Sequence, residues 1–134
     1  MDFRRARTRH LRLGRRGEDA ACRYLRHRGT EVLLRNYRVP GGEIDIIARD
    51  GLTLCFIEVK TRRATASHRP ATGLSPRQED RIRHAAMAYL REIGHPRLPW
   101  RFDLIEVIMD PRDIRELRHW PRHFAARRPR QRTP

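Results

Sequence analysis

Apolar residues recur at helical spacing near the start of the chain. Between about Gly14 and His27, Ala21, Cys22 and Leu25 fall on one face of a helix. Gly29 suits the position just past the end of that helix, where a left-handed backbone is common. This pattern predicts a first helix over residues 14–27.

A second helical stretch carries start and stop signals. Ser75 suits the N-cap, Pro76 the first helical position, and Gln78 completes a capping box. Gly94 ends the helix. Its apolar residues form one face: Ile82, Ala85, Ala86, Tyr89, Leu90 and Ile93.

Four stretches are typical of β-strands and cover residues 31–38, 43–48, 52–61 and 100–109. Pro40-Gly41-Gly42 predicts a turn after the first strand, and Asp50-Gly51 a tight hairpin turn after the second. The second helix then connects two parallel strands by a crossover. The order α-β-β-β-α-β predicts an α/β fold with three layers and a mixed sheet.

Positive charge gathers at the two ends of the chain. The 134 residues carry 31 Lys and Arg against 16 Asp and Glu, a net charge of +15. Residues 1–16 and 112–134 each carry +6 of it. We therefore expect a basic arm over residues 1–13, a domain over 14–110 and a basic, partly disordered tail over 111–134.

This charge favours a polyanionic partner, with DNA expected ahead of RNA. Thirty of the 31 basic residues are arginine, so a GC-rich genome is an alternative source of the basic count. Apolar runs are too short to span a bilayer, and no secretory signal opens the chain. Cys22 and Cys55 lie in apolar segments without a metal-ligand spacing, which favours a cytoplasmic location away from membranes.

Two acidic residues fall on neighbouring strands. A two-residue turn at Asp50-Gly51 would pair Arg49 with Leu52. In that register, Asp45 and Glu58 are diagonal neighbours on one face, about 7–8 Å apart. Two carboxylates at this separation repel each other unless a cation or a shared proton lies between them.

Further charged residues accompany this pair. Glu18 shares the helix stripe that should face the sheet, and such a cluster suits a hard cation such as Mg²⁺. Each residue also has a structural interpretation. Glu18 would be a first-turn acid, Asp45 an edge charge, and Glu58 with Lys60 a solvated face. For Glu43, on the exposed start of its strand, we favour the structural role.

Five segments of the chain resemble the YraN family of uncharacterised bacterial proteins: GRRGEDAA, RNYR, GEIDIIARD, CFIEVKTRR and RFDLIEV. That resemblance covers roughly Gly14 to Ile108. The chain is also similar to the PD-(D/E)XK nuclease superfamily, which implies a restriction-endonuclease-like core. Asp45 matches its first acid, and Glu58-Val59-Lys60 its (D/E)XK element. Ile44 stands where that motif has proline.

The resemblance implies a division of roles. Asp45, Glu58 and the carbonyl of Val59 would bind Mg²⁺ or Mn²⁺, and Glu18 would support a second metal or its water shell. Lys60, the only lysine of the chain, would orient or help to deprotonate the attacking water. Four arginines are expected to contact nucleic acid: Arg15, Arg16, Arg62 and Arg63.

We therefore expect a metal-dependent endonuclease acting on structured or branched DNA. Two alternatives stay open: a binding module without turnover, and an RNA-processing or ribosome-linked factor. A resolvase-like activity would need a homodimer to place two sites. Trp100 and Phe102 suit either stacking on bases or core packing, and we favour core packing.

Overall fold

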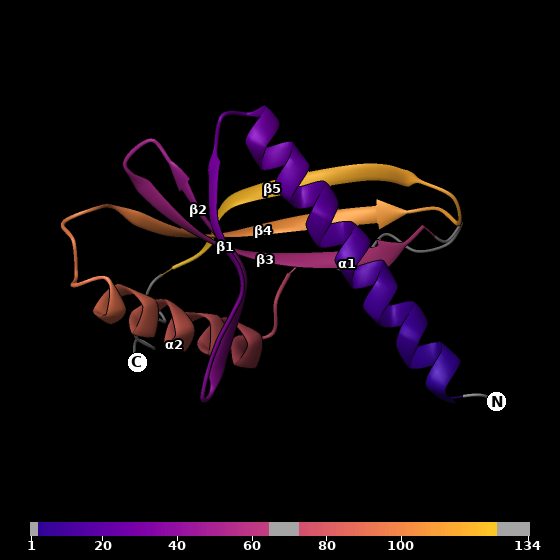
Figure 1. Ribbon diagram of the computed structural model, residues 1–134, viewed down its shortest axis with the longest axis horizontal. Helices are drawn as coiled ribbons and strands as arrows, with labels where there is room; N and C mark the ends of the chain where they lie inside the picture. Colours follow the sequence, from indigo (N-terminus) through magenta and orange to yellow (C-terminus); the bar gives the residue numbers. More distant parts are fainter. Residues whose placement is uncertain (1–2, 65–72, 126–134) are drawn as a thin grey trace, which may run out of the picture.

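The computed structural model describes residues 3–64 and 73–125. Its elements, drawn in Figure 1, are α1 Phe3–His27, β1 Glu31–Val39, β2 Gly42–Asp50, β3 Thr53–Arg63, α2 Pro76–Glu92, β4 Trp100–Met109 and β5 Ile114–Phe124. The predicted start of α2 is confirmed. The Ser75 side chain accepts a hydrogen bond from the Gln78 N–H, and the Gln78 side chain accepts one from the Ser75 N–H.

The five strands form one mixed sheet in the order β1-β2-β3-β4-β5. Only β3 and β4 run parallel, because α2 carries the chain back between them. The predicted α/β class, mixed sheet and crossover are thus confirmed. No helix in the described part of the chain is both long enough and apolar enough to cross a bilayer.

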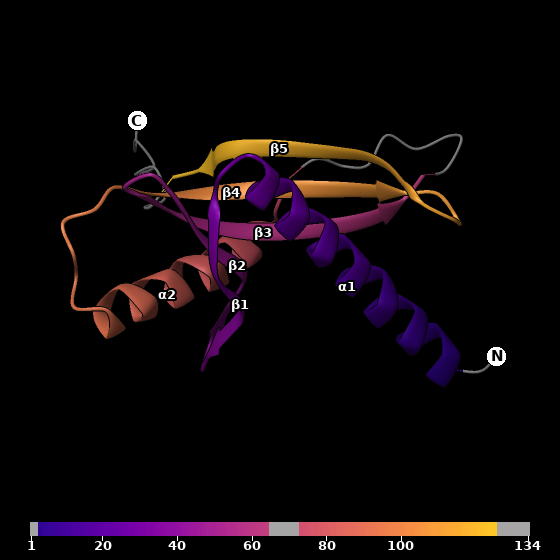
Figure 2. The ribbon, with the colours of Figure 1, turned by 45° about the horizontal axis from the view of Figure 1, so that its top comes forward.

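The sheet is covered by one helix on each face, as Figures 1 and 2 show. Strand alternation divides the core accordingly. Ile57 and Val59 of β3 pack with Ala21 and Leu25 of α1. Phe56, between them on β3, packs on the other side with the apolar face of α2. Both faces are thus buried, which makes this a three-layer domain.

The β1–β2 hairpin turns away from the rest of the sheet. Figures 1 and 2 show it running across the direction of β3, β4 and β5. β2 pairs with β3 only as far as Ile46 with Ile57, whereas it stays paired with β1 down to Gly42. We call the point beyond Ile46 and Ile57, where β2 and β3 part, the fork. It places Asp45 and Glu58 at an opening in the sheet.

Regular structure extends beyond the predicted domain of residues 14–110 at both ends. α1 begins at Phe3 rather than near Gly14, so the arm predicted over residues 1–13 is largely helix. Residues 114–124 of the predicted tail form β5, antiparallel to β4. Charged residues suit an outer strand, because they face water there. The arginines of β5 therefore interrupt the alternation of apolar and polar residues by which a strand is predicted. Residues 126–134 lie outside the described part of the chain.

The hairpin turn between β2 and β3 lies one residue later than predicted. Asp50 pairs with Thr53, so the turn residues are Gly51 and Leu52. Gly51 has φ +60°, and the Leu52 side chain is exposed. Arg49 therefore pairs with Leu54 instead of Leu52. A shift of two residues keeps every side chain on its predicted face, and the same register continued would set Asp45 directly opposite Glu58.

A buried aspartate holds β5 on β4. The Asp103 carboxylate accepts hydrogen bonds from the Arg101 side chain, from His119 Nε2 at 2.8 Å and from the Arg122 N–H at 3.0 Å. Burial opposes ionisation, but the bonds from His119 and Arg122 prevail and lower the pKa of Asp103. Tyr24 of α1 in turn contacts His119 Nδ1 at 3.0 Å, which joins the helix to β5.

A buried glycine sets how closely α1 approaches β3. A Cβ added to Gly17 would overlap the Thr61 hydroxyl, whereas one added to Gly14 meets no atom within 4 Å. Because Glu18 follows Gly17 in the helix, the same approach brings the Glu18 carboxylate towards the fork.

We predict that Gly17→Ala destabilises the fold by about 1–3 kcal/mol through this overlap. Gly14→Ala is the matched control in the same helix. It should be neutral or stabilise by up to about 1 kcal/mol, because alanine is the better helix former. Urea unfolding of the two variants and the parent measures the difference. Equal stability of the two variants would show that α1 does not depend on this contact.

Candidate functional site

The Asp45 carboxylate replaces a missing strand contact at the fork. Its Oδ2 accepts a hydrogen bond from the backbone N–H of Val59 at 2.8 Å. In a continuing sheet, a carbonyl of β2 would take that N–H. This hydrogen bond from the β3 backbone therefore fixes the position of the Asp45 carboxylate.

Glu58 lies beside Asp45, and their side chains are hydrogen-bonded to each other. Burial, followed by the Asp45 charge, raises the pKa of Glu58 to about 9. Burial also raises the pKa of Asp45, although the Val59 N–H works against this. The predicted closeness of the two carboxylates is confirmed. Burial and mutual repulsion thus favour a shared proton over two charges in the metal-free Asp45–Glu58 pair.

Lys60 is the nearest cation to this pair on β3. Its Nζ lies 3.8 Å from Glu58 Oε1, and its side chain is 26% exposed. That distance exceeds the 2.7–2.9 Å expected for a charge-assisted hydrogen bond, so the ammonium is near Glu58 but not bonded to it.

Glu18 reaches the same region from α1. Its side chain is 14% exposed, and burial, together with the Asp45 charge, raises its pKa. Arg35 of β1 lies 3.7 Å from it and offsets part of this effect. The interpretation of Glu18 as a first-turn acid was wrong, because α1 begins at Phe3.

An open cavity of about 580 Å³ joins these groups. Its lining comes from α1, β1, β2 and β3: Gly14, Arg15, Glu18, Asn36, Arg38, Asp45, Glu58 and Val59. Four elements of the fold thus meet at the fork.

The arginines expected to contact nucleic acid are placed differently. Arg15 lines the cavity. Arg16 instead donates a hydrogen bond from Nη2 to the carbonyl oxygen of Arg112 at 3.4 Å. Arg62 and Arg63 end β3 rather than beginning a loop, and Arg63 is exposed. Arg15 is thus the one of the four that the cavity lining includes.

Asn36 and Arg38 were missed by sequence reasoning. Asn36 has φ +53°, which asparagine tolerates better than most residues, and its side chain is hydrogen-bonded to Glu18. Arg38 lies 3.7 Å from Glu43, its partner in the β1–β2 register. That pairing supports the structural role expected for Glu43. The motif RNYR contained both missed residues, but only the hairpin geometry shows where they point.

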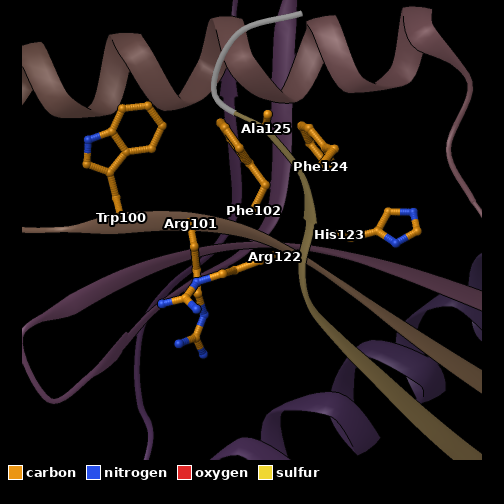
Figure 3. Close-up of a pocket in the computed structure, with 7 residues that line it drawn as sticks. All are labelled: Trp100, Arg101, Phe102, Arg122, His123, Phe124 and Ala125. Atoms are coloured by element: carbon orange, nitrogen blue, oxygen red, sulfur yellow. The ribbon is translucent and has the colours of Figure 1, made fainter. Parts of the chain in front are cut away.

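A second cavity, of about 490 Å³, lies at the far end of β4 and is shown in Figure 3. Phe102 is buried in its wall and stacks on Phe124 with ring centroids 4.5 Å apart. Trp100 packs edge-on against Phe102. Core packing of Phe102 is therefore confirmed. Arg101 and Arg122 extend to the other side of the strand.

The residues at the fork fit a divalent cation. Asp45 and Glu58 bring two carboxylates together in a half-buried place, which is unfavourable unless a proton or a cation is shared. Mg²⁺ commonly takes one or two carboxylates and completes its shell with water and phosphate. Within the described residues, no group of three or more His, Cys, Asp or Glu side chains is gathered as a metal site. The fit therefore rests on the pair itself.

Comparison with known proteins places the chain in a family. The family model described as "Uncharacterised protein family UPF0102" matches residues 17–107. The chain belongs to this family. The resemblance to the YraN family is thereby confirmed.

Relatives in this family cover most of the chain. A UPF0102 protein of Chlorobaculum parvum is 47% identical over 107 residues, 78% of this chain and 83% of its own length. One of Nocardia farcinica is 43% identical over 74% of this chain and 78% of its own length. One of Geobacter sulfurreducens is 41% identical over 80% of this chain and 84% of its own length. The matched region includes the whole fork.

We predict that Glu58→Gln makes the stability of the metal-free protein less dependent on pH. A carboxyl with a raised pKa keeps its proton when folded, so the parent loses stability as pH rises from 4.5 to about 9. Glutamine has no proton to lose. With chelator present, the Tm of the variant minus that of the parent should therefore increase as the pH rises across this range.

Glu31→Gln, at an exposed position on β1, is the control and should follow the parent at every pH. A constant difference in Tm between Glu58→Gln and the parent would contradict the raised pKa.

Proposed function

We propose that this protein binds nucleic acid and hydrolyses its phosphodiester bonds with a divalent cation held at the fork. The observation that carries the proposal is the Asp45–Glu58 pair, hydrogen-bonded side chain to side chain, with Lys60 Nζ 3.8 Å from Glu58. The arrangement agrees with the PD-(D/E)XK resemblance of the sequence.

Each residue has a defined part in this proposal. Asp45, Glu58 and the carbonyl of Val59 would hold Mg²⁺ or Mn²⁺. Such a cation supplies polarisation of a phosphoryl oxygen and acidification of a water molecule. Lys60 would place its ammonium beside the developing negative charge of the phosphate. Glu18, on the opposite wall, would accept a hydrogen bond from water or hold a second cation.

The surroundings of the cavity suit a polyanion. Arg15 and Arg38 lie on its lining, from α1 and β1, and could contact phosphates on either side of the fork. The chain as a whole carries +15, so attraction to nucleic acid should be strong and salt-dependent. Structured or branched DNA is the substrate class we favour, in which case a homodimer would supply two sites.

We predict that the parent cleaves at least one substrate in a panel of single-stranded, duplex, flap and four-way-junction DNA and matched RNA. Cleavage should need Mg²⁺ or Mn²⁺ and stop with chelator. Asp45→Asn should lower the rate at least about 100-fold, because it removes a ligand charge while keeping the shape.

Asp50→Asn is the matched control, since it changes an exposed aspartate at the end of the same strand. Its rate should equal that of the parent. If Asp45→Asn cuts as fast as the parent, the activity has another origin. Binding without cleavage of any substrate would favour the binding-module alternative, and cleavage of RNA alone the RNA-processing one.

We predict that Lys60→Arg also abolishes cleavage although it preserves charge. A guanidinium is broad and planar, keeps its proton, and binds carboxylates with two parallel hydrogen bonds. It would clamp Glu58 and occupy the place of the cation. Single-turnover cleavage at saturating, matched binding measures this. Equal rates would mean that Lys60 contributes charge alone.

A further inference from the structure

One buried carboxylate of the sheet has no hydrogen-bond partner among the described residues, although its charge acts on Arg118. Glu106 of β4 is 0% exposed, and neither of its carboxylate oxygens has a hydrogen-bond partner among the described residues. Buried carboxylates are almost always paired with a cation or protonated, because burial without a partner is costly. Glu106 therefore requires an explanation that packing does not give.

Three cations lie within reach of Glu106. Lys60 of β3 and Arg118 of β5 are its direct partners in the strand registers, so their side chains leave the same face of the sheet. Arg62 is the diagonal neighbour on β3. Arg118 is already held by Glu116, through contacts of 2.7 and 3.2 Å. Lys60 and Arg62 are left as candidates.

Lys60 is the better placed of the two. It lies directly opposite Glu106, whereas Arg62 is paired with Ile108 and reaches Glu106 only diagonally. The buried Nε of Arg62 is without a hydrogen-bond partner among the described residues, so Arg62 is the competing candidate. The Lys60 ammonium is ion-paired with Glu58 at 3.8 Å, too far for a short hydrogen bond to that carboxylate. A rotation about the side-chain bonds of Lys60 would carry the ammonium from Glu58 towards Glu106.

We infer that Glu106 is the positioning residue of Lys60: its carboxylate is a second anchor that holds the ammonium beside the Asp45–Glu58 pair. The catalytic meaning of this anchor rests on the proposed function. With Lys60 on Glu106, both oxygens of Glu58 are free for a cation. Without Glu106, the ammonium has only Glu58 to bind, and it then competes with the divalent cation for the Glu58 oxygens.

The single lysine of the chain allows a direct test. Protein labelled with ¹⁵N-lysine gives one side-chain signal, from Lys60 Nζ. An anchored ammonium exchanges its hydrogens slowly with water. In Glu106→Gln, exchange should be at least about tenfold faster, as expected for loss of a hydrogen bond to a charged group.

Glu31→Gln changes an exposed carboxylate on β1, so it is the control and should leave the signal unchanged. An unchanged Lys60 signal in Glu106→Gln would overturn the inference, as would an equal change in both variants.

A double-mutant cycle in chelator supplies an independent reading. Lys60→Met removes the ammonium that would anchor on Glu106, so we expect it to lower the Tm of the parent by about 5–10 °C. In the Glu106→Gln background, the same change should cost less than half as much. Additive shifts would overturn the inference. A cycle in which Arg62→Met, and not Lys60→Met, couples to Glu106 would overturn it as well.

Cleavage then separates this inference from the proposed function. Glu106→Gln should lower the single-turnover rate at least about tenfold while binding nucleic acid as the parent does. If the parent cleaves nothing, the proposed function fails, but the coupling of Lys60 to Glu106 is still measured. If the parent cleaves and Glu106→Gln matches its rate, the positioning role fails alone.

Discussion

The hydrogen bond from the Val59 N–H to Asp45 Oδ2 is the constraint on which the site depends. When β2 turns away from β3, the sheet loses a carbonyl acceptor, and a buried N–H without a partner is costly. A carboxylate fills that place and so becomes fixed within reach of the next acid, Glu58. The hydrogen bond that completes the ladder at the fork thus also holds the Asp45 carboxylate in place.

Other contacts keep the fork open and its walls in place. Gly17 lets α1 approach Thr61, which brings Glu18 to the wall opposite β3. Gly42 allows an equally close approach on the other side, because a Cβ there would meet the carbonyl of Arg81 at 2.6 Å. The hairpin therefore leans on α2 while α1 crosses the other face, as Figure 2 shows. The opening between β2 and β3 follows from packing on both faces, not from a loop.

Sequence reasoning captured those features that depend on local chemistry. The capping box at Ser75 and the strand at residues 100–109 were predicted at their observed places, since caps and alternation are properties of neighbouring residues. The error in the β2–β3 turn did not separate Asp45 from Glu58, because a shift of two residues preserves the face. β5 was missed because its pairing with β4, and the buried Asp103 that secures it, are long-range contacts that charge composition conceals.

The part of the site that the sequence could not show is its arrangement of charge. Asp45, Glu58 and Lys60 were recognisable from spacing, but Asn36 and Arg38 reach the cavity only through the twist of the β1–β2 hairpin. Sequence reasoning did not single out Glu106, because it lies in an apolar strand. Its pairing with Lys60 in the strand register places it next to that residue. A single ammonium between acids on two strands cannot neutralise both. Under the proposed function, a cation on the Asp45–Glu58 pair would complete the balance of charge at the fork and leave Lys60 to Glu106.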